Sequence, residues 1–255
     1  LSTGEYDEDT VLPGPAVLDL PQTSADLPNA FDGACGPNDE VSFTRAMTIS
    51  CNTAFAAVGM KLGADAIRAQ AERFGFGEAL SIPMRVTPST IPAELNQPQL
   101  AQSAIGQFDV RVTPLQMAMV AAGVANEGTV MKPYLVQSVI GSDLSVIETT
   151  AEQELSEAVT PDVAAQLIRM MEAVVDRGTA KAAQIDGVAV AGKSGTAQTG
   201  EGRKAHAWFI SFAPADDPQI AVAVIAEDGG VAGNEAGGGA VAAPIARKMM
   251  EARLK

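Results

Sequence analysis

The last third of the chain places the strongest limit on the fold, because three apolar segments follow one another there with short connections. The segments cover residues 187–193, 206–212 and 219–226 and have the length and apolar content of β-strands. A parallel pair needs a crossover connection, usually a helix, and the stretches between these strands are too short for one. The sequence therefore predicts an antiparallel meander of three strands.

Apolar residues that recur at three- and four-residue steps predict helices that cover this sheet. Thr-Pro pairs mark two of the helix starts, since Thr caps a helix and Pro suits its first turn. The predicted helices are 43–63, 64–77, 113–125, 160–178 and 240–253. The fold class is α/β of the α+β type, with an antiparallel sheet flanked by helices beside a mostly helical lobe.

The 255 residues suit a single domain with three regions of different composition. Residues 1–40 are rich in Pro, Gly, Asp and Asn, which predicts a loop-rich N-terminal segment with one short strand at 15–20. Residues 41–128 are expected to form the mostly helical lobe. Residues 129–255 are expected to form the lobe of sheet and helices, which begins with a strand-like segment at 129–140.

The composition excludes several classes of function. The chain has 17 Lys and Arg against 31 Asp and Glu, a formal net charge of −14, which argues against nucleic acid and anionic membrane surfaces as partners. One histidine and two cysteines make no metal site, and no cofactor is expected. Cys35 and Cys51 could form a disulfide in an exported protein, whereas Cys51 would be a small core residue in a cytosolic one.

Residues 187–194 match the phosphate-loop pattern G-x-x-x-x-G-K-[ST], which would indicate a nucleotide-binding protein. Such a loop needs a strand before it and a helix that begins at its Lys-Ser end. Here the interior of the pattern is an apolar run typical of a strand, and the glycines after Ser194 make a poor helix start. Nucleotide binding is therefore the weaker interpretation.

The tetrad Lys193-Ser194-Gly195-Thr196 predicts instead a cradle for a ligand with a terminal carboxylate. If the tetrad ends an edge strand, Gly195 lets a ligand backbone approach closely. Lys193 brings a positive charge, and the hydroxyls of Ser194 and Thr196 can donate hydrogen bonds to a carboxylate. The Thr196 amide can point at a developing oxyanion. For these four residues alone, an ordinary strand that enters a hairpin turn remains the alternative.

Ser50 and Asn52 interrupt the apolar pattern of the helix predicted at 43–63. Residues two positions apart do not share a face of a regular helix, so both could face a cleft only at a helix start or in a distorted turn. The alternative is that both side chains bond back to the backbone of a buried helix.

Together the two motifs resemble one superfamily, because S-x-N followed by K-[ST]-G is the signature of penicillin-binding proteins and serine β-lactamases. Longer segments resemble the transpeptidase domain of class B penicillin-binding proteins, above all the cell-division-type group of actinobacteria. These segments are RAMTISCNTAFAAVGMKLG, SAIGQFDVRVTPLQMAMVAAGVANEGTVMKPYLV, DRGTAKAAQIDGVAVAGKSGTAQ and HAWFISFAPADDPQIAVAVIAEDGG. The resemblance runs from about residue 35 to the C-terminus.

The resemblance implies a peptidoglycan D,D-transpeptidase that works through a serine acyl-enzyme and is inhibited by penicillin. Its implied partners are peptidoglycan stem peptides, β-lactams and cell-division membrane proteins. Ser50 would pass protons to or from the leaving group, Asn52 would hold the substrate amide, and Lys193 would stabilise an alkoxide-like Ser50. Ser194, Gly195 and Thr196 would bind the substrate carboxylate, with the Thr196 amide as half of an oxyanion hole.

The chain departs from the family pattern at the nucleophile. The family's nucleophile lies in S-x-x-K, upstream of S-x-N, and no serine of this chain is followed by lysine three positions later. Residues 1–10, LSTGEYDEDT, resemble the residues that come after the S-x-x-K helix in the family. We therefore expect the nucleophile in a missing N-terminal segment of the same protein. We also expect the parent protein at the extracytoplasmic face of the membrane, anchored by an N-terminal helix that is absent here.

Two alternatives to the transpeptidase remain. A non-catalytic module of the same fold would bind stem peptides or serve as a scaffold. A β-lactamase would need a deacylation device, for which no glutamate of this chain can be identified. Gly106-Gln107 resembles a loop that borders the family's cleft, where a turn is expected and a substrate contact is the alternative. His206 is expected to begin a strand, and the glycine-rich run 233–239 is expected to form a turn before the last helix.

Overall fold

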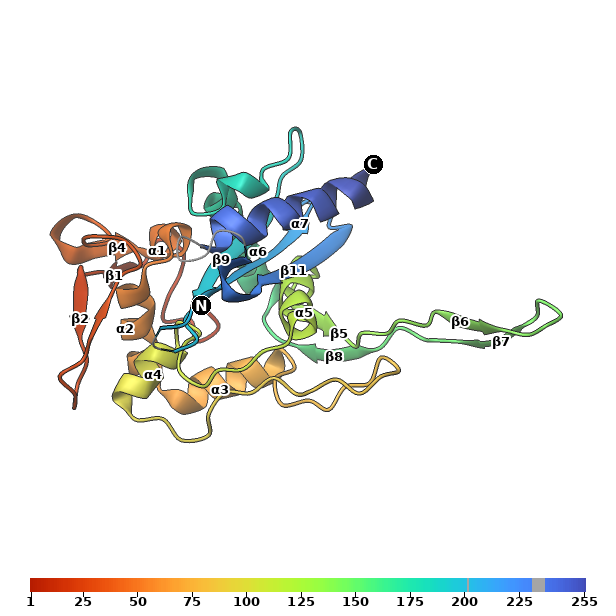
Figure 1. Cartoon of the computed structure of the whole chain (residues 1–255), viewed down its shortest axis with the longest axis horizontal. Coiled ribbons are helices and arrows are strands. Elements are labelled where there is room, and N and C mark those ends of the chain that lie inside the picture. Colours follow the sequence, from red (N-terminus) through yellow and green to blue (C-terminus); the bar gives the residue numbers. More distant parts are fainter. Residues whose placement is uncertain (201, 231–236) are drawn as a thin grey trace.

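The computed structural model describes residues 1–200, 202–230 and 237–255 (Figure 1). Its α-helices are α1 (Phe43–Ile49), α2 (Asn52–Leu62), α3 (Ala64–Arg73), α4 (Gln97–Ser103), α5 (Pro114–Ala125), α6 (Pro161–Arg177) and α7 (Gly238–Leu254). Its strands are β1 (Val11–Pro13), β2 (Val17–Asp19), β3 (Asp26–Pro28), β4 (Glu40–Ser42), β5 (Thr129–Met131), β6 (Ser138–Ile140), β7 (Val146–Thr149), β8 (Glu154–Glu157), β9 (Ala191–Ala197), β10 (His206–Ala213) and β11 (Ile220–Ala226).

The largest sheet is the antiparallel meander that the sequence predicts, in the order β11-β10-β9. Phe209 and Phe212 of β10 point to opposite faces, because side chains alternate along a strand. On one face Phe209 packs against buried residues of α7, including Ala246 and Met250. On the other face Phe212 packs against α5 and α6. Helices therefore cover both faces, whereas β9 forms one edge of the sheet (Figure 1).

The helical lobe consists of α1 to α4 and two short antiparallel ladders, β1 with β4 and β2 with β3. The helices α2 and α4 lie close together where Gly59 faces Ala104, since a Cβ at Gly59 would lie only 2.2 Å from the Ala104 Cβ. Met47 of α1 packs against the α7 side of the sheet, the α5 side of the sheet and the core of the helical lobe. This one side chain thus links the two lobes.

A long two-stranded arm leaves the body between α5 and α6 (Figure 1). The pair β5–β8 forms its base, and β6–β7 forms its outer part. Every residue of β6 and β7 is exposed, including Ile140 and Ile147, at 56% and 69% of their surface. The arm therefore contributes little to the buried core.

Local signals place several helices correctly. Thr113 and Thr160 cap α5 and α6 as predicted, and each hydroxyl accepts a hydrogen bond from the backbone three residues later. The helices predicted at 64–77 and 240–253 correspond to α3 and α7. Helix α4 was not predicted from the sequence, although Asn96 and Gln99 form a complete capping box.

Other predicted boundaries are wrong. The single helix at 43–63 is two helices, because the chain turns sharply at Ser50 and Cys51. The strand predicted at 187–193 begins only at Ala191 and extends to Ala197. The expected strand at 15–20 is the shorter β2, and the N-terminal segment contains two further short strands, β1 and β3, and ends where β4 begins.

The segment predicted as one strand at 129–140 contains β5 and β6, separated by an irregular stretch. Most of the glycine-rich run 233–239 lies outside the described residues. None of the described helices combines the length and the apolar content that a membrane span requires.

Candidate active site

A cleft of about 1070 Å³ lies between the edge of the sheet and the helical lobe. Its walls come from β9, from the junction of α1 and α2, from the turn after α4 and from the first residues of α7. The predicted site residues on its lining are Ser50, Asn52, Lys193, Ser194, Gly195 and Thr196. The fold therefore brings together two motifs that are more than 140 positions apart in the sequence.

Ser50 lies in the break between α1 and α2. It has a left-handed backbone, with φ 58° and ψ 54°, and the amide of Cys51 closes a turn onto the carbonyl of Ala46 at 2.9 Å. Because of this break, Ser50 and Asn52 can both line the cleft, which a regular helix would prevent. Of the two possibilities that the sequence left open, the distorted turn is the one observed.

Lys193 reaches across the cleft from β9 and connects the two motifs. Its Nζ donates hydrogen bonds to the Oγ of Ser50 at 2.8 Å and to the carbonyl of Ser194 at 2.7 Å. Burial lowers the pKa of the Lys193 ammonium to about 8, because both acceptors are neutral and do not replace the lost water in full. A lysine poised near neutral pH can exchange a proton with the serine it contacts.

The K-S-G-T tetrad ends one residue before the C-terminal end of β9, which is an edge strand of the sheet, as predicted. The Ser194 hydroxyl is 2.6 Å from the Thr179 hydroxyl, on the loop that follows α6. Gly195 lies beneath the start of α7, where a Cβ on Gly238 would meet the Gly195 carbonyl at 2.5 Å. Thr196 is exposed to the cleft. The tetrad thus contributes two hydroxyls and one ammonium to the lining of the cleft.

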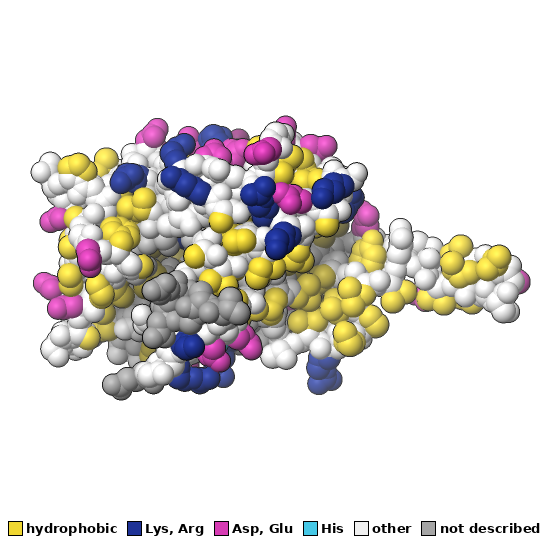
Figure 2. All heavy atoms as spheres, turned by 45° about the horizontal axis from the view of Figure 1, so that its top comes forward, with side chains coloured by type: hydrophobic (Ala, Val, Ile, Leu, Met, Phe, Trp, Pro, Cys, Tyr) yellow, Lys and Arg dark blue, Asp and Glu magenta, His cyan; other side chains and the backbone are white. Residues whose placement is uncertain are grey.

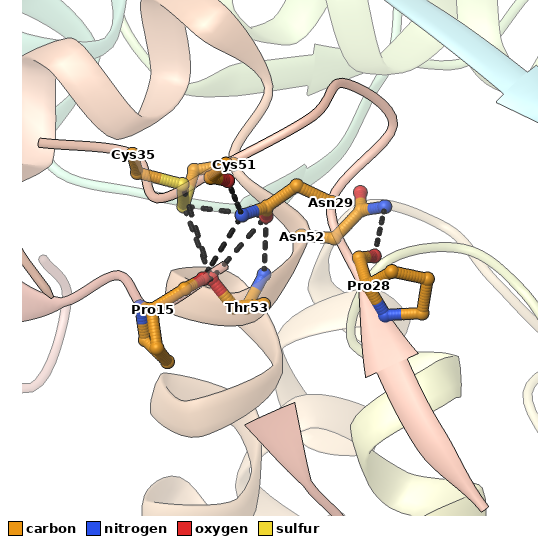
Figure 3. The surroundings of a disulfide bond; sticks show 8 residues. Pro15, Pro28, Asn29, Cys35, Cys51, Asn52 and Thr53 are labelled. Atoms are coloured by element: carbon orange, nitrogen blue, oxygen red, sulfur yellow. Dashed lines mark hydrogen bonds between the residues drawn. A yellow bond between two sulfur atoms is a disulfide. The ribbon is translucent and has the colours of Figure 1, made fainter. Parts of the chain in front are cut away.

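Asn52 lies at the first position of α2, and its side-chain amide donates to the carbonyl of Pro28 at 3.2 Å (Figure 3). The amide therefore bonds to the wall of the cleft. Beside it, Asn29 accepts a hydrogen bond from the Thr53 amide at 3.2 Å and donates to the carbonyl of Pro15 at 3.0 Å. Figure 3 shows how Asn29 joins the loop after β3 to the start of α2.

Cys35 and Cys51 form a disulfide, so the first of the two possibilities left open by the sequence is the observed one (Figure 3). Both residues are fully buried in the core of the helical lobe. Because Cys51 lies between Ser50 and Asn52, the disulfide holds the break that presents these two side chains to the cleft.

At Gly106-Gln107 the sequence favoured a turn over a contact with the substrate, and the structure adds a contact with β9. Gly106 has φ 76°, which confirms the turn. The Gln107 side chain spans to β9, where its Nε2 donates to the Thr196 carbonyl at 2.9 Å and its Oε1 accepts from the Gln198 amide at 3.2 Å. Thr179 was also missed, because only the fold places it beside Ser194.

Two other features have structural roles. His206 begins β10, as expected, and its Nδ1 accepts a hydrogen bond from the Asp228 amide at 2.9 Å. The stretch after Lys193 and Ser194 is strand and not helix, which contradicts the phosphate-loop interpretation. Within the described ranges, no three His, Cys, Asp or Glu side chains gather as metal ligands would.

Sequence comparison with known proteins supports the same family as the two motifs in the cleft. Residues 23–251 match the model of the family described as penicillin binding protein transpeptidase domain. The chain is 45% identical over 240 residues to a protein of Mycolicibacterium smegmatis named peptidoglycan D,D-transpeptidase PbpA, covering 92% of this chain and 48% of that protein. A protein of the same name from Mycobacterium tuberculosis is 40% identical, covering 100% of this chain and 52% of that protein.

Solved structures of penicillin-binding proteins and transpeptidase domains share the fold of this chain. Penicillin-binding protein A of M. tuberculosis, as a ceftriaxone acyl-enzyme complex, superimposes with a TM-score of 0.95 at 40% identity, covering 99% of this chain and 57% of that one. A D,D-transpeptidase domain from Eggerthella lenta superimposes with a TM-score of 0.86 at 30% identity, covering 100% of this chain and 63% of that one. The chain spans about half the length of the curated relatives it matches. The resemblance to class B enzymes is confirmed, and the chain belongs to the penicillin-binding protein transpeptidase family.

Proposed function

We propose that this chain supplies the substrate-binding and proton-transfer groups of a peptidoglycan D,D-transpeptidase. One observation carries the proposal: Lys193 Nζ donates to Ser50 Oγ at 2.8 Å, beside a strand edge lined with hydroxyls. This pair joins the two motifs that define the family. A lysine with a pKa near 8 can accept and return a proton at neutral pH, and Ser50 can relay that proton to a reacting group.

The proposed ligand is a stem peptide that ends in D-Ala-D-Ala. Its carboxylate would bind the hydroxyls of Ser194 and Thr196 near the Lys193 ammonium, and Gly195 leaves room for its backbone. The carbonyl of the penultimate D-Ala would face the Thr196 amide as its oxyanion develops. Asn52 would exchange its bond to Pro28 for one to the substrate amide.

The reaction that we propose is acyl transfer in two steps. A serine hydroxyl attacks the carbonyl carbon of the penultimate D-Ala, the peptide C–N bond breaks, and the terminal D-Ala leaves as an amine that takes a proton from Ser50. The amine of a neighbouring stem then attacks the ester and releases the serine. Since these 255 residues contain no S-x-x-K, the nucleophile and its lysine would come from a segment outside them.

The proposed location is the extracytoplasmic face of the membrane, where stem peptides are crosslinked. The disulfide between Cys35 and Cys51 supports this location, because disulfides persist in oxidising compartments. Anchoring by a helix outside this chain and contact with cell-division membrane proteins belong to the same proposal. Labelling of intact cells with a membrane-impermeant penicillin derivative tests the location, since a cytoplasmic protein would be labelled only after lysis.

Intact-mass spectrometry of the protein expressed from its complete reading frame tests the activity. The transpeptidase predicts that benzylpenicillin adds the mass of one penicillin molecule and that Ser50→Ala and Lys193→Ala each slow this addition about 100-fold or more. The exposed Lys132→Ala on the arm serves as the matched control and should react like the wild type. If the protein binds penicillin reversibly and its mass never changes, the non-catalytic binding module is the correct function.

A further inference from the structure

The free edge of β9 is the part of the cleft that an extended ligand would use. β10 takes the hydrogen bonds on one side of β9, and the other side faces the cleft. Residues at alternate positions along a strand present their N–H and C=O groups to the same side, so Thr196 and Gln198 both present theirs to the cleft. Such an edge is a template for an added strand.

Gln107 already occupies part of this edge. Its side-chain amide donates to the Thr196 carbonyl and accepts from the Gln198 amide, so it uses one acceptor and one donor of the strand at once. The flanking residues fix its position, because Gly106 and Phe108 have φ values of 76° and 51° and the Gln107 amide donates to the Gln102 carbonyl at 3.0 Å. The turn after α4 is thus fastened to the strand that carries the K-S-G-T tetrad.

We infer that Gln107 is a positioning residue that competes with the ligand for the free edge of β9. Its side chain must release the Thr196 carbonyl before an extended ligand can form both of its hydrogen bonds with Thr196. The inference rests on the proposed function, since it assumes a ligand that pairs with this edge. In an antiparallel pair, one ligand residue exchanges two hydrogen bonds with the residue opposite it. Its carbonyl would accept from the Thr196 amide, and its own N–H would donate to the Thr196 carbonyl, which Gln107 holds in the free cleft.

This competition affects only ligands that carry such an N–H group. A ligand that carries this N–H group must break the hydrogen bond from Gln107 to the Thr196 carbonyl before it can form its own hydrogen bond there, so its net gain in binding free energy is small. A ligand without the N–H group leaves the hydrogen bond from Gln107 intact. One net hydrogen bond corresponds to about a fivefold change in an equilibrium constant, so removing Gln107 should favour the first kind of ligand by about fivefold.

Hydrogen exchange of the ligand-free protein, expressed from its complete reading frame, tests the contact itself. In the wild type the Gln198 amide should exchange slowly, and Gln107→Ala should speed its exchange several-fold. Gln107→Glu keeps an acceptor for the Gln198 amide and removes the donor to Thr196, so protection of Gln198 should remain. The exposed Gln137→Ala on the arm is the matched control and should leave Gln198 unchanged. Equal exchange in wild type and Gln107→Ala would overturn the inference.

Acylation rates of the same variants test the competition. Benzylpenicillin carries a side-chain amide N–H next to its reactive carbonyl, whereas penicillanic acid sulfone lacks that amide. Both Gln107→Ala and Gln107→Glu should accelerate acylation by benzylpenicillin about fivefold and leave the rate with the sulfone unchanged. A change that is equal for both compounds, or a slower reaction with benzylpenicillin, would mean that Gln107 only supports the loop. If neither compound acylates the wild type, the proposed function fails, and the exchange experiment still decides the role of Gln107.

Discussion

Ser50 has a left-handed backbone, which is unfavourable for a residue with a Cβ by about 1 to 2 kcal/mol. Glycine has no such penalty, yet the hydroxyl that Lys193 contacts requires serine. We predict that Ser50→Gly is more stable than Ser50→Ala by about 1 kcal/mol, because both lose the hydroxyl and only alanine keeps the strain. Urea unfolding of the two variants measures this difference.

The rate of acylation by penicillin, measured for the same two Ser50 variants, distinguishes the role of the hydroxyl in the reaction from its effect on stability. Both Ser50 variants should lose the reaction to a similar extent, although their stabilities differ. If Ser50→Gly reacted like the wild type, the hydroxyl would have no part in proton transfer. A Ser50→Ala variant as stable as Ser50→Gly would mean that the surrounding turn relaxes at no cost.

Lys193 should make the stability of the protein depend on pH. Its pKa is lowered from 10.5 to about 8 in the folded state, so between these values the unfolded chain binds more protons than the folded one. The contribution of Lys193 to the free energy of unfolding therefore rises with pH through this window, by up to about 3 kcal/mol in total, and is least favourable below pH 8. Unfolding curves at several pH values between 7 and 11 measure the rise.

Lys193→Met isolates the contribution of this one group, since methionine has a similar length and carries no charge. The difference in unfolding free energy between wild type and variant should change by up to about 3 kcal/mol from pH 8 to pH 10.5. Other lysines and tyrosines titrate in both proteins and cancel. A difference that stays constant over this range would contradict a lowered pKa at Lys193.

At the scale of the elements, the disulfide fastens the start of α2 to the loop before β4. Cys35 and Cys51 enclose a loop of 16 positions, for which loop-closure entropy predicts a stabilisation of about 3 kcal/mol. We predict that replacing both cysteines by alanine lowers the unfolding free energy by about this amount. The variant should also slow penicillin acylation, because Ser50 and Asn52 flank Cys51.

A reducing agent provides the control for this prediction. It should destabilise the wild type and leave the double alanine variant unchanged. If the reduced wild type kept both its stability and its acylation rate, the turn at Ser50 would be held by its own hydrogen bonds, including the one from the Cys51 amide to the Ala46 carbonyl.

The sequence predicted those elements whose signals are local. Thr113 and Thr160 identify two helix starts through their own side-chain bonds. The apolar period of residues 43–63 continues across Ser50, so periodicity alone could not reveal the break. The start of β9 was misplaced because Val188 and Val190 alternate like strand residues, although the ladder with β10 begins at Ala191.

At the scale of the whole molecule, the site depends on contacts that no local pattern contains. Ser50 and Lys193 are 143 positions apart, and Gln107 and Thr196 are 89 positions apart. The motifs predict that Ser50 and Lys193 carry chemistry, whereas Thr179 and Gln107 are ordinary turn residues by composition. They acquire a role only when the helical lobe and the sheet edge come together around the cleft.

The arm formed by β6 and β7 projects away from the body of the molecule, with apolar side chains along its exposed surface (Figures 1 and 2), and none of its residues lines the cleft. The backbones of Gln137 and Thr150 are hydrogen-bonded at 2.8 Å, so a two-residue Asn-Gly turn can replace residues 138–149 and close the shortened arm. All but one of the removed residues are exposed, Leu144 at 83% of its surface, and β6 and β7 add nothing to the buried clusters.

We therefore predict that this deletion changes the unfolding free energy by no more than about 0.5 kcal/mol and leaves penicillin acylation at the wild-type rate. It should also reduce self-association, because the removed strands expose apolar side chains beside free backbone edges. Chemical unfolding, acylation kinetics and sedimentation of wild type and variant measure the three quantities. A large loss of stability or a slower acylation would show that the arm supports the cleft through the β5–β8 base. The outer strands and the cleft would then be linked energetically, although they share no buried cluster.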